Sequence, residues 1–493
     1  MPTNADSTTS RTSTAYSVKY ESSLFSVIAR GAYNYRNTYF VTGTFRRDAS
    51  SKFAKNNKAA YFPSVGVAWQ LSNEQFLRNN KHINTLKLRY SYGSSGNSGI
   101  GPYGSLPLFT AANYPIGTTV VPGYAQDPTK PGNPDFKWET THQHDLGFET
   151  TLFKKLSVEF DYYRKTTGDL IQNMELAPST GFSSVYSNIG EVVNKGYELT
   201  LNYKLIDTKN FQWSAGGNLS FNNNTVTSLG NGTTRIFPNN LWNDLRPFII
   251  AEGRPIGQLY GYTENGLWNS RAEVISSDQF QKIYPGYTTD SHNETTEKII
   301  RERWIGEVRI QDLNQDGMIT EEDQDYIGNV NPDFLYALNM NFNWKKLEFS
   351  FLINGVYGND IINMSNLRFH NLGQTRNVPV EVLEKAWKPE SGGSNPKIFT
   401  TNARDLFFTN RYFEDGSYLK LRNVSIGYTF TNVGSALQSV RIYASGNNLL
   451  TFTSYTGYDP EVNAFGSNPS SRGVDAGGYP QSREFTFGIN VTL

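Results

Sequence analysis

The chain has 493 residues, with 45 basic side chains, 45 acidic side chains and no cysteine. Because cysteine is absent, a disulfide framework and cysteine-based metal or redox sites are excluded. The balanced charge argues against a nucleic-acid partner, since a general nucleic-acid binder carries a basic surface. The sequence contains no apolar run of 18 or more residues and therefore predicts no transmembrane helix.

Residues 1–22 form a polar segment rich in serine and threonine. A secretory signal peptide needs an apolar core, which this segment lacks, so we expect no signal peptide in this chain. We interpret residues 1–22 as the remnant of an extracellular loop. Residues 23–493 contain every strand that the sequence predicts.

Residues 23–493 repeatedly alternate apolar and polar side chains. Tyr197, Leu199 and Leu201, for example, alternate with Glu198 and Thr200. Successive side chains of a strand point to opposite sides, so this period predicts strands with one apolar face and one polar face. The predicted strands lie near residues 23–34, 38–47, 60–72, 85–93, 140–153, 155–166, 194–206, 210–222, 333–345, 346–357, 416–430, 439–449 and 483–493.

The connections between these strands alternate between short turns and long polar loops. Short turns are predicted at 36–37, 154–155, 207–209 and 345–346, and long loops at about 94–139, 167–193, 223–332, 358–415 and 450–482. This combination is typical of an outer-membrane barrel, which has tight periplasmic turns and large extracellular loops. We therefore predict an all-β fold, an antiparallel transmembrane β-barrel with the long loops on one rim and the short turns on the other.

The eleventh and the last strands carry further local signals. In the eleventh, the apolar residues change parity between Leu421 and Val424, which predicts a β-bulge. In the last, Phe485, Phe487 and Ile489 begin an alternation that continues to the carboxyl terminus. A soluble protein would leave such an apolar edge strand open to aggregation, so this pattern favours a membrane setting.

The segment 312–323 has the spacing of a calcium-binding loop, with oxygen ligands at positions 1, 3, 5 and 12 and glycine at position 6. Gly328 and Pro332 leave no room for the exit helix of an EF-hand. A solvated turn explains the same residues, because aspartate at position 12 reaches less far than the usual glutamate, and the sequence leaves both interpretations open. The expected Ca²⁺ ligands are the side chains of Asp312, Asn314, Asp316 and Asp323 and the backbone carbonyl of Met318.

Two pairs of polar residues invite a functional interpretation. His142 and His144 share one strand face and could form a metal pair, but with no third ligand we interpret them as lumen-facing polar side chains. Glu159 and Asp161 also share a face and could act as a carboxylate pair, although barrel interiors are routinely polar.

The long loop 223–332 carries three tryptophans, Trp242, Trp268 and Trp304. They could stack on a sugar ring, but we favour packing within the loop. No Ser/His/Asp or Cys/His arrangement is recognisable, so we predict no catalytic residue and no enzyme. The sequence identifies no substrate-binding residues.

Several longer runs are informative together: Tyr39 to Phe53, Tyr61 to Trp69, Leu86 to Gly93, Gly355 to Asp360, Gly416 to Val424 and Gly446 to Leu450, besides the calcium-type loop. They are spread over nearly the whole chain. Jointly they resemble the SusC/RagA family of TonB-dependent outer-membrane receptors. One departure is mild, since Gly306-Glu307 stands where family members often carry Gly-Asp.

The resemblance implies import of oligosaccharides or peptides across the outer membrane of Bacteroidetes-type bacteria. The implied partners are a SusD-like surface lipoprotein, the TonB system of the inner membrane and outer-membrane lipid. Family members are similar to 22-stranded transporters with a plugged lumen. Residues 23–493 are then expected to be the C-terminal portion of that barrel, with 223–332 as a long extracellular loop. Because no plug or TonB-contacting segment is visible, we expect a fragment that does not transport alone.

A second hypothesis belongs to a different class of protein. The calcium-type loop and the aromatic residues of the loops would also suit a secreted or surface-bound Ca²⁺-dependent glycan-binding β-protein. Dependence on detergent separates the two hypotheses, because such a lectin stays soluble without it.

Overall fold

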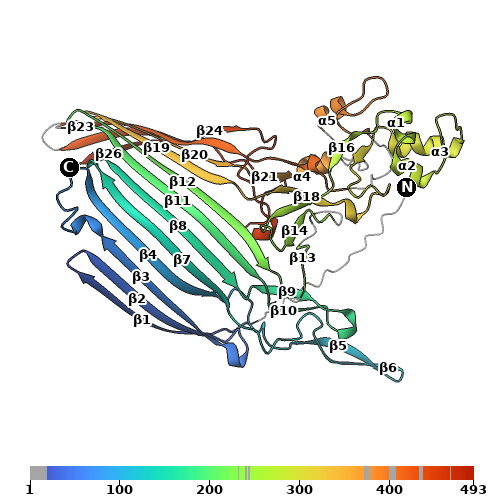
Figure 1. The fold of residues 1–493 in the computed structure, drawn as a ribbon, viewed down its shortest axis with the longest axis horizontal. Helices are drawn as coiled ribbons and strands as arrows, with labels where there is room; N and C mark the ends of the chain where they lie inside the picture. Colours follow the sequence, from blue (N-terminus) through green and yellow to red (C-terminus); the bar gives the residue numbers. More distant parts are fainter. Residues whose placement is uncertain are drawn as a thin grey trace, which may run out of the picture.

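The fold is described from a computed structural model. It covers the chain apart from residues 1–18, 231, 239–240, 242–244, 371–376, 378, 399–406, 432, 434–436 and 467. Its main feature is one antiparallel sheet of thirteen strands, in which neighbours in the sheet are also successive in the order of these strands along the chain (Figure 1). The strands are β1 Leu24–Tyr35, β2 Tyr39–Ser50, β3 Ala59–Gln70, β4 Ile83–Asn97, β7 Glu139–Leu152, β8 Leu156–Gly168, β11 Glu191–Asp207, β12 Phe211–Ser228, β19 Phe334–Trp344, β20 Leu347–Tyr357, β23 Tyr418–Thr431, β24 Ser439–Thr453 and β26 Glu484–Thr492. All thirteen predicted strands are confirmed.

The strands form because each offers one uniform apolar side to the same face of the sheet. Leu199 on β11 pairs with Phe160 on β8 and with Leu219 on β12, so apolar side chains line up across the strands. We call this side of the sheet the apolar face and the opposite side the polar face. Large side chains remain exposed on the apolar face, such as Tyr197 at 52% and Leu201 at 40%, as lipid contact requires.

The predicted β-bulge lies in β23. Leu421 and Asn423 pair with the successive residues Ile353 and Leu352 of β20, so Arg422 is the extra residue against that strand, and the pairing with β24 also shifts there. The bulge explains the change of apolar parity in the sequence, because one inserted residue reverses which side chains face each way.

Several strands extend further toward the long loops than predicted. β12 continues to Ser228 and β11 begins at Glu191. Asn222, Asn223 and Asn224 are not typical strand residues, yet they remain paired with β11. The backbone ladder continues there because tertiary pairing overrides weak side-chain preference.

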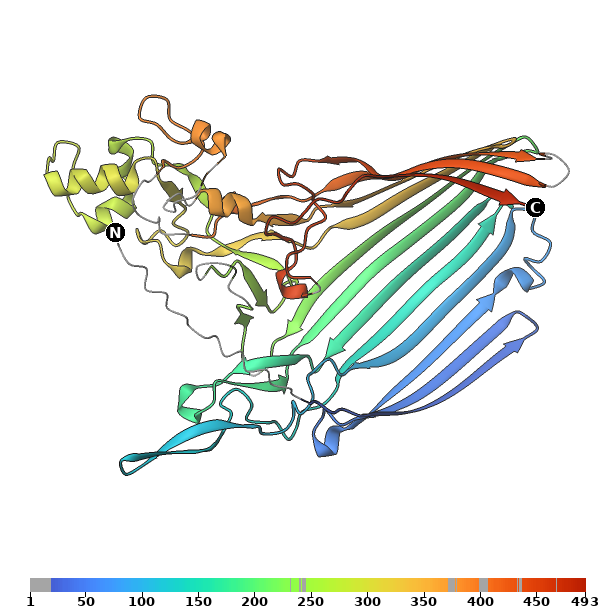
Figure 2. The same cartoon turned by 180° about the vertical axis from the view of Figure 1, so that it is seen from behind.

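The two ends of the sheet differ as predicted. Figures 1 and 2 show the long connections, with their helices and small sheets, gathered at one end, while short turns and the C-terminus lie at the other. The turns after Leu152, Asp207 and Trp344 belong to the short end. One short-end connection, residues 71–82, is longer than a tight turn and contains the 3₁₀ helix Leu71–Asn73.

The long loops carry structure of their own, which alternation in the sequence did not predict. Their strands are β5 Phe109–Ile116, β6 Thr119–Gln126, β9 Ile171–Glu175, β10 Ser184–Asn188, β13 Arg235–Ile236, β14 Phe248–Ala251, β15 Gln258–Gly261, β16 Glu264–Leu267, β17 Val308–Ile310, β18 Asp325–Asn329, β21 Asp360–Asn363, β22 Phe413–Asp415 and β25 Val474–Asp475. Their helices are α1 Arg271–Ile275, α2 Asp278–Ile283, α3 Glu294–Ile299, α4 Met364–His370 and α5 Val380–Lys385. Among the described residues, no helix is both long and apolar enough to cross a membrane.

The largest buried core lies in the loops rather than in the sheet. Phe248 and Leu259 come from the loop between β12 and β19, Ile362 and Leu367 from the loop between β20 and β23, and Val474 from the loop before β26. Three loops that are far apart in sequence therefore pack as one body at the long-loop end.

Candidate functional site

The polar face of the sheet carries a charged network on three neighbouring strands. Arg89 on β4 contacts Glu149 on β7 at 2.5 Å and Glu159 and Asp161 on β8 at 2.7 and 2.5 Å. Glu159 and Asp161 therefore both bind the Arg89 guanidinium, which also contacts Glu149. This confirms the prediction of a polar interior and gives no acid–base site.

A buried lysine anchors the last loop against the polar face. Lys420 on β23 is only 1% exposed, and its Nζ lies 2.7 Å from Asp459 Oδ1 and 2.9 Å from Glu461 Oε2. Arg422, the bulged residue, also pairs with Glu461. Burial would raise the pKa of Glu461, but hydrogen bonds from Arg422, Lys420 and Tyr418 lower it to about 2. These ion pairs hold loop 454–483 against β23.

Loop 454–483 presents exposed aromatic rings next to this anchor. Tyr458 is 79% exposed and Tyr479 95% exposed. Close to Tyr479, the Asp475 carboxylate accepts hydrogen bonds from the backbone N–H groups of Gly477 and Gly478. Exposed tyrosines on a fixed backbone suit stacking against a sugar ring or a peptide side chain.

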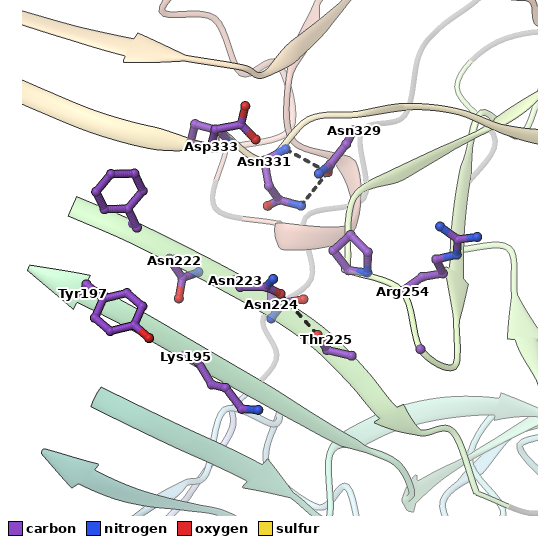
Figure 3. Close-up of a pocket in the computed structure, with 14 residues that line it drawn as sticks. Lys195, Tyr197, Asn222, Asn223, Asn224, Thr225, Arg254, Asn329, Asn331 and Asp333 are labelled. Carbon is purple, nitrogen blue, oxygen red and sulfur yellow. Dashed lines mark hydrogen bonds between the residues drawn. The ribbon is translucent and has the colours of Figure 1, made fainter. Parts of the chain in front are cut away.

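A cavity of about 480 Å³ opens where β12 and the segment entering β19 separate (Figure 3). Asn331 donates from both its backbone and its side-chain nitrogen to Asn329 Oδ1, which fixes the upper wall. The cavity is mostly polar and combines cations with one carboxylate. Its lining residues include Lys195, Tyr197, Phe221, Asn222, Asn223, Asn224, Thr225, Arg254, Asn329, Asn331 and Asp333.

The calcium-type loop is folded tightly around its first aspartate. Asp312 Oδ1 accepts a hydrogen bond from Gln315 N at 2.7 Å and Oδ2 accepts one from Gly317 N at 2.8 Å. Gly317 has a φ of +79°, the left-handed conformation that glycine adopts without strain. The sharp turn expected at position 6 is therefore present.

The last residue of this loop closes it from inside. Asp323 is fully buried, and its two carboxylate oxygens accept hydrogen bonds from Leu313 N at 2.9 Å and Thr320 N at 2.7 Å. Asn314 Oδ1 and Asp316 Oδ1 likewise accept backbone N–H groups within the loop. In the described part of the chain, no three His, Cys, Asp or Glu side chains are grouped as a metal site. The donor set of this loop is carboxylate, amide and carbonyl oxygen, which is the chemistry that Ca²⁺ prefers.

The histidine pair lies on the wrong face for the predicted role. His142 and His144 share the parity of Leu146, so they lie on the apolar face, and the lumen-facing interpretation is wrong. Tyr92 and Tyr90 hydrogen-bond to the Nδ1 atoms of His142 and His144 at 3.0 and 2.9 Å. The apolar residues that follow on the same strand were the signal that could have revealed this.

The two described tryptophans of the long loop, Trp268 and Trp304, pack within the loop, as the sequence analysis favoured. Trp268 is 5% exposed and meets Trp304 edge-on at 5.5 Å between ring centroids, in a core built around Phe280. Trp242 lies outside the described residues.

The sequence analysis did not predict the carboxylate partners of Lys420. Two cations, Lys420 and Arg422, on the polar side of one strand were the signal that carboxylates lie nearby.

Comparison with known proteins identifies the fold. Residues 2–449 match the family model described as TonB dependent receptor-like, beta-barrel. The chain belongs to this family. It is a family of outer-membrane barrel receptors rather than of enzymes, and the SusC/RagA resemblance is confirmed by similar proteins within it.

Two similar receptors of known sequence illustrate the relation. TonB-dependent receptor P3 of Formosa agariphila is 35% identical over 487 residues, which are 96% of this chain and 46% of that receptor. TonB-dependent receptor SusC of Bacteroides thetaiotaomicron is 26% identical over 501 residues, 98% of this chain and 44% of SusC. The chain thus spans about half the length of the curated relatives it matches.

Solved structures agree on the fold. The RagAB peptide transporter superposes with a TM-score of 0.76 at 24% identity, over 95% of this chain and 47% of that chain. The RagAB peptide importer in its closed-closed state gives a TM-score of 0.74 at 25% identity, over the same shares. Together with the family model, these matches show that the thirteen strands are part of a TonB-dependent receptor barrel.

Proposed function

We propose that this chain forms the wall of an outer-membrane import receptor that takes up oligosaccharides or peptides. The observation that carries the proposal is the thirteen-stranded sheet, with lipid-suited side chains on the apolar face and an ion-paired loop on the polar face. Membership of the receptor family favours this function over a secreted Ca²⁺-dependent glycan-binding protein. The wall contributes a polar lumen and exposed tyrosines, which contact substrate as it passes.

The proposed receptor works with two partners. A SusD-like surface lipoprotein would meet the receptor at the long-loop rim, and the TonB system would drive transport from the periplasm. This follows the similarity to SusC and to RagAB. Three of the long loops, those before β19, β23 and β26, share a core that would form part of this rim.

Uptake by cells that depend on this receptor tests the proposal. Replacing Tyr458 and Tyr479 by alanine is expected to reduce energy-dependent uptake of labelled oligosaccharides or peptides, because stacking surface is lost. Changing Tyr33 and Tyr35 on β1 to alanine is the control, since they are exposed tyrosines of the sheet itself. A receptor that imports neither class of compound contradicts the proposal, and the class that is imported names the substrate.

We also propose that the loop 312–323 binds Ca²⁺ as a structural ion. Asp312, Asn314, Asp316 and Asp323 would hold it with their side chains, together with the carbonyl oxygen of Met318. The loop packs against α2, because a Cβ at position 317 would lie 3.2 Å from the carbonyl oxygen of Asp278. A bound ion would therefore fix the helical segment relative to the strand that follows.

Hydrogen exchange with and without metal tests the calcium proposal. Ca²⁺ is expected to slow exchange of amides 312–323, and Mg²⁺ to do so less, because it demands stricter geometry. Asp316→Asn should abolish the effect, while Asp290→Asn, at an exposed loop position, should retain it. Identical exchange with and without Ca²⁺ would show that the loop is a turn without metal.

A further inference from the structure

Five neighbouring strands place four aromatic rings and one leucine in a row across the apolar face near the long-loop end. Tyr90 on β4 pairs with Leu146 on β7, and Leu146 pairs with Tyr162 on β8. Tyr162 pairs with Tyr197 on β11, which pairs with Phe221 on β12. We call these five residues the aromatic row.

A second row lies one step nearer the long loops on the same face. Tyr92 pairs with His144, His144 with Arg164, Arg164 with Lys195, and Lys195 with Asn223. Arg164 and Lys195 are both exposed. We call these five residues the basic row.

The height of the two rows matches the outer surface of a membrane. β11 ends at Asp207 beside the short turns, so Tyr197 is ten residues and Lys195 twelve residues above that end. With about 3.3 Å per residue and a strand tilt of about 40°, Tyr197 lies roughly 25 Å and Lys195 roughly 30 Å above the short turns. The apolar band of an outer-membrane barrel is about 25 Å tall and is bordered by aromatic residues. The basic row therefore stands at the level of the lipid headgroups.

The two positive charges of the basic row, on Arg164 and Lys195, favour binding of an anion. Arg164 and Lys195 are directly opposite each other on adjacent strands, and like charges in that position destabilise a sheet. No ion pair joins either of them to a carboxylate in the described part of the chain. The same five strands carry no acidic residue on this face from the aromatic row to the row above the basic row.

The cavity beside Lys195 extends this surface toward β19. Arg254 lines it as a second cation, with its guanidinium 4.1 Å from the ring centre of Tyr326. Asn223 and Thr225 add polar groups, and Asp333 is the carboxylate among the lining residues (Figure 3). A headgroup held by Arg164 and Lys195 would thus have room and hydrogen-bonding partners for an attached sugar.

We propose that Arg164 and Lys195 bind the phosphate of a phosphorylated glycolipid in the outer leaflet. The aromatic row contacts the boundary between acyl chains and headgroup, while the two cations neutralise the phosphate. The proposal rests on the outer-membrane position of the wall given under Proposed function. It assigns a lipid site to a surface that takes no part in uptake.

Lipid binding by the purified complete receptor tests the proposal. Native mass spectrometry measures its affinity for lipid A, for dephosphorylated lipid A and for inorganic phosphate. Each basic residue near an anionic surface contributes about 1 kcal/mol, so R164Q/K195Q is expected to weaken binding of lipid A about 30-fold. Binding of dephosphorylated lipid A should not change, and R164K/K195R should keep the affinity because it keeps both charges.

The matched control removes two positive charges from the same two strands, but on the opposite face of the sheet. Lys165 and Lys204 lie on the same two strands and face the polar side, so K165Q/K204Q should bind lipid A as the unmodified receptor does. Equal loss in both double variants, or no loss in R164Q/K195Q, would overturn the proposal. Binding of inorganic phosphate as tightly as lipid A would assign the site to a free anion instead. Insertion of the receptor into neutral vesicles tests the membrane position of the wall independently of lipid A binding. A failure of the lipid-site proposal can therefore be distinguished from a failure of the proposed function.

Discussion

Lys420 illustrates how one buried charge positions a loop. Its side chain is almost fully enclosed and makes short contacts with Asp459 and Glu461. Removing one partner from a buried ion pair leaves the other charge without compensation, which costs about 3–5 kcal/mol. The contact joins β23 to loop 454–483, so the effect should appear in that loop.

Lys420→Met is predicted to release loop 454–483. We expect the free energy of opening this loop to fall by about 3–5 kcal/mol, because Asp459 loses its cation. Hydrogen exchange of amides 454–483 measures the change. Lys346→Met is the control, since Lys346 lies exposed in a short turn. Unchanged exchange in the Lys420 variant would contradict the prediction.

We expect the helix α3 to lose stability at acid pH because of its residue Glu297. Its hydrogen bonds to Arg271 lower its pKa to about 2, although burial opposes the shift and Tyr287 adds a further bond. A carboxylate with a lowered pKa stabilises the fold above its unfolded pKa of about 4.3, and this contribution is lost as pH falls from about 4 to about 2. We expect exchange protection of α3 to hold at pH 5 and to fall below pH 4. Glu297→Gln should weaken protection at pH 7 and abolish its acid dependence, and an unchanged profile would refute the assignment.

At the level of the strands, glycine and tyrosine act as pairs that bridge three strands. Tyr163 on β8 lies over Gly196 on β11 and donates a hydrogen bond to Asn222 on β12 at 2.9 Å. Tyr336 on β19 similarly lies over Gly355 on β20. In each case the missing side chain lets the ring lie flat against the neighbouring strand.

Gly196→Val is predicted to destabilise the sheet by about 1–3 kcal/mol, the usual effect of overpacking. A Cβ at position 196 would lie 2.4 Å from the Tyr163 ring, so the ring must move and lose its bond to Asn222. The midpoint of denaturant unfolding in lipid vesicles measures this effect. Gly43→Val is the matched control, because nothing lies within 4 Å of a Cβ there. Equal midpoints for the two variants would disprove the bridging role.

For the whole molecule, the absence of cysteine allows a direct test of topology. A cysteine at Thr118, between β5 and β6 on the long-loop rim, should react with an impermeant maleimide on intact cells. A cysteine at Lys346 should react only after the outer membrane is opened, because the turn before β20 lies at the opposite end. Labelling of both positions on intact cells would contradict the arrangement in Figure 1.

The sequence alone determined the thirteen strands, a bulge between Leu421 and Val424 and the sorting of loops by length. These features depend on alternation over a few residues, and each strand has to present one apolar side to lipid. The same rule would have placed His142 on the apolar face, because its parity matches that of Leu146 and Phe148. The spacing of the calcium-type loop also predicted the turn at Gly317, while its metal remains a prediction.

Only the tertiary structure decided how the long loops pack and which charges meet. The core joins Phe248, Ile362 and Val474, which come from three different loops and are each more than a hundred residues apart, and no local pattern records such contacts. The partners of Lys420 and the row formed by Arg164 and Lys195 likewise depend on register between strands. Register sets which side chains lie opposite each other, and it is fixed by pairing across the whole sheet rather than within one strand.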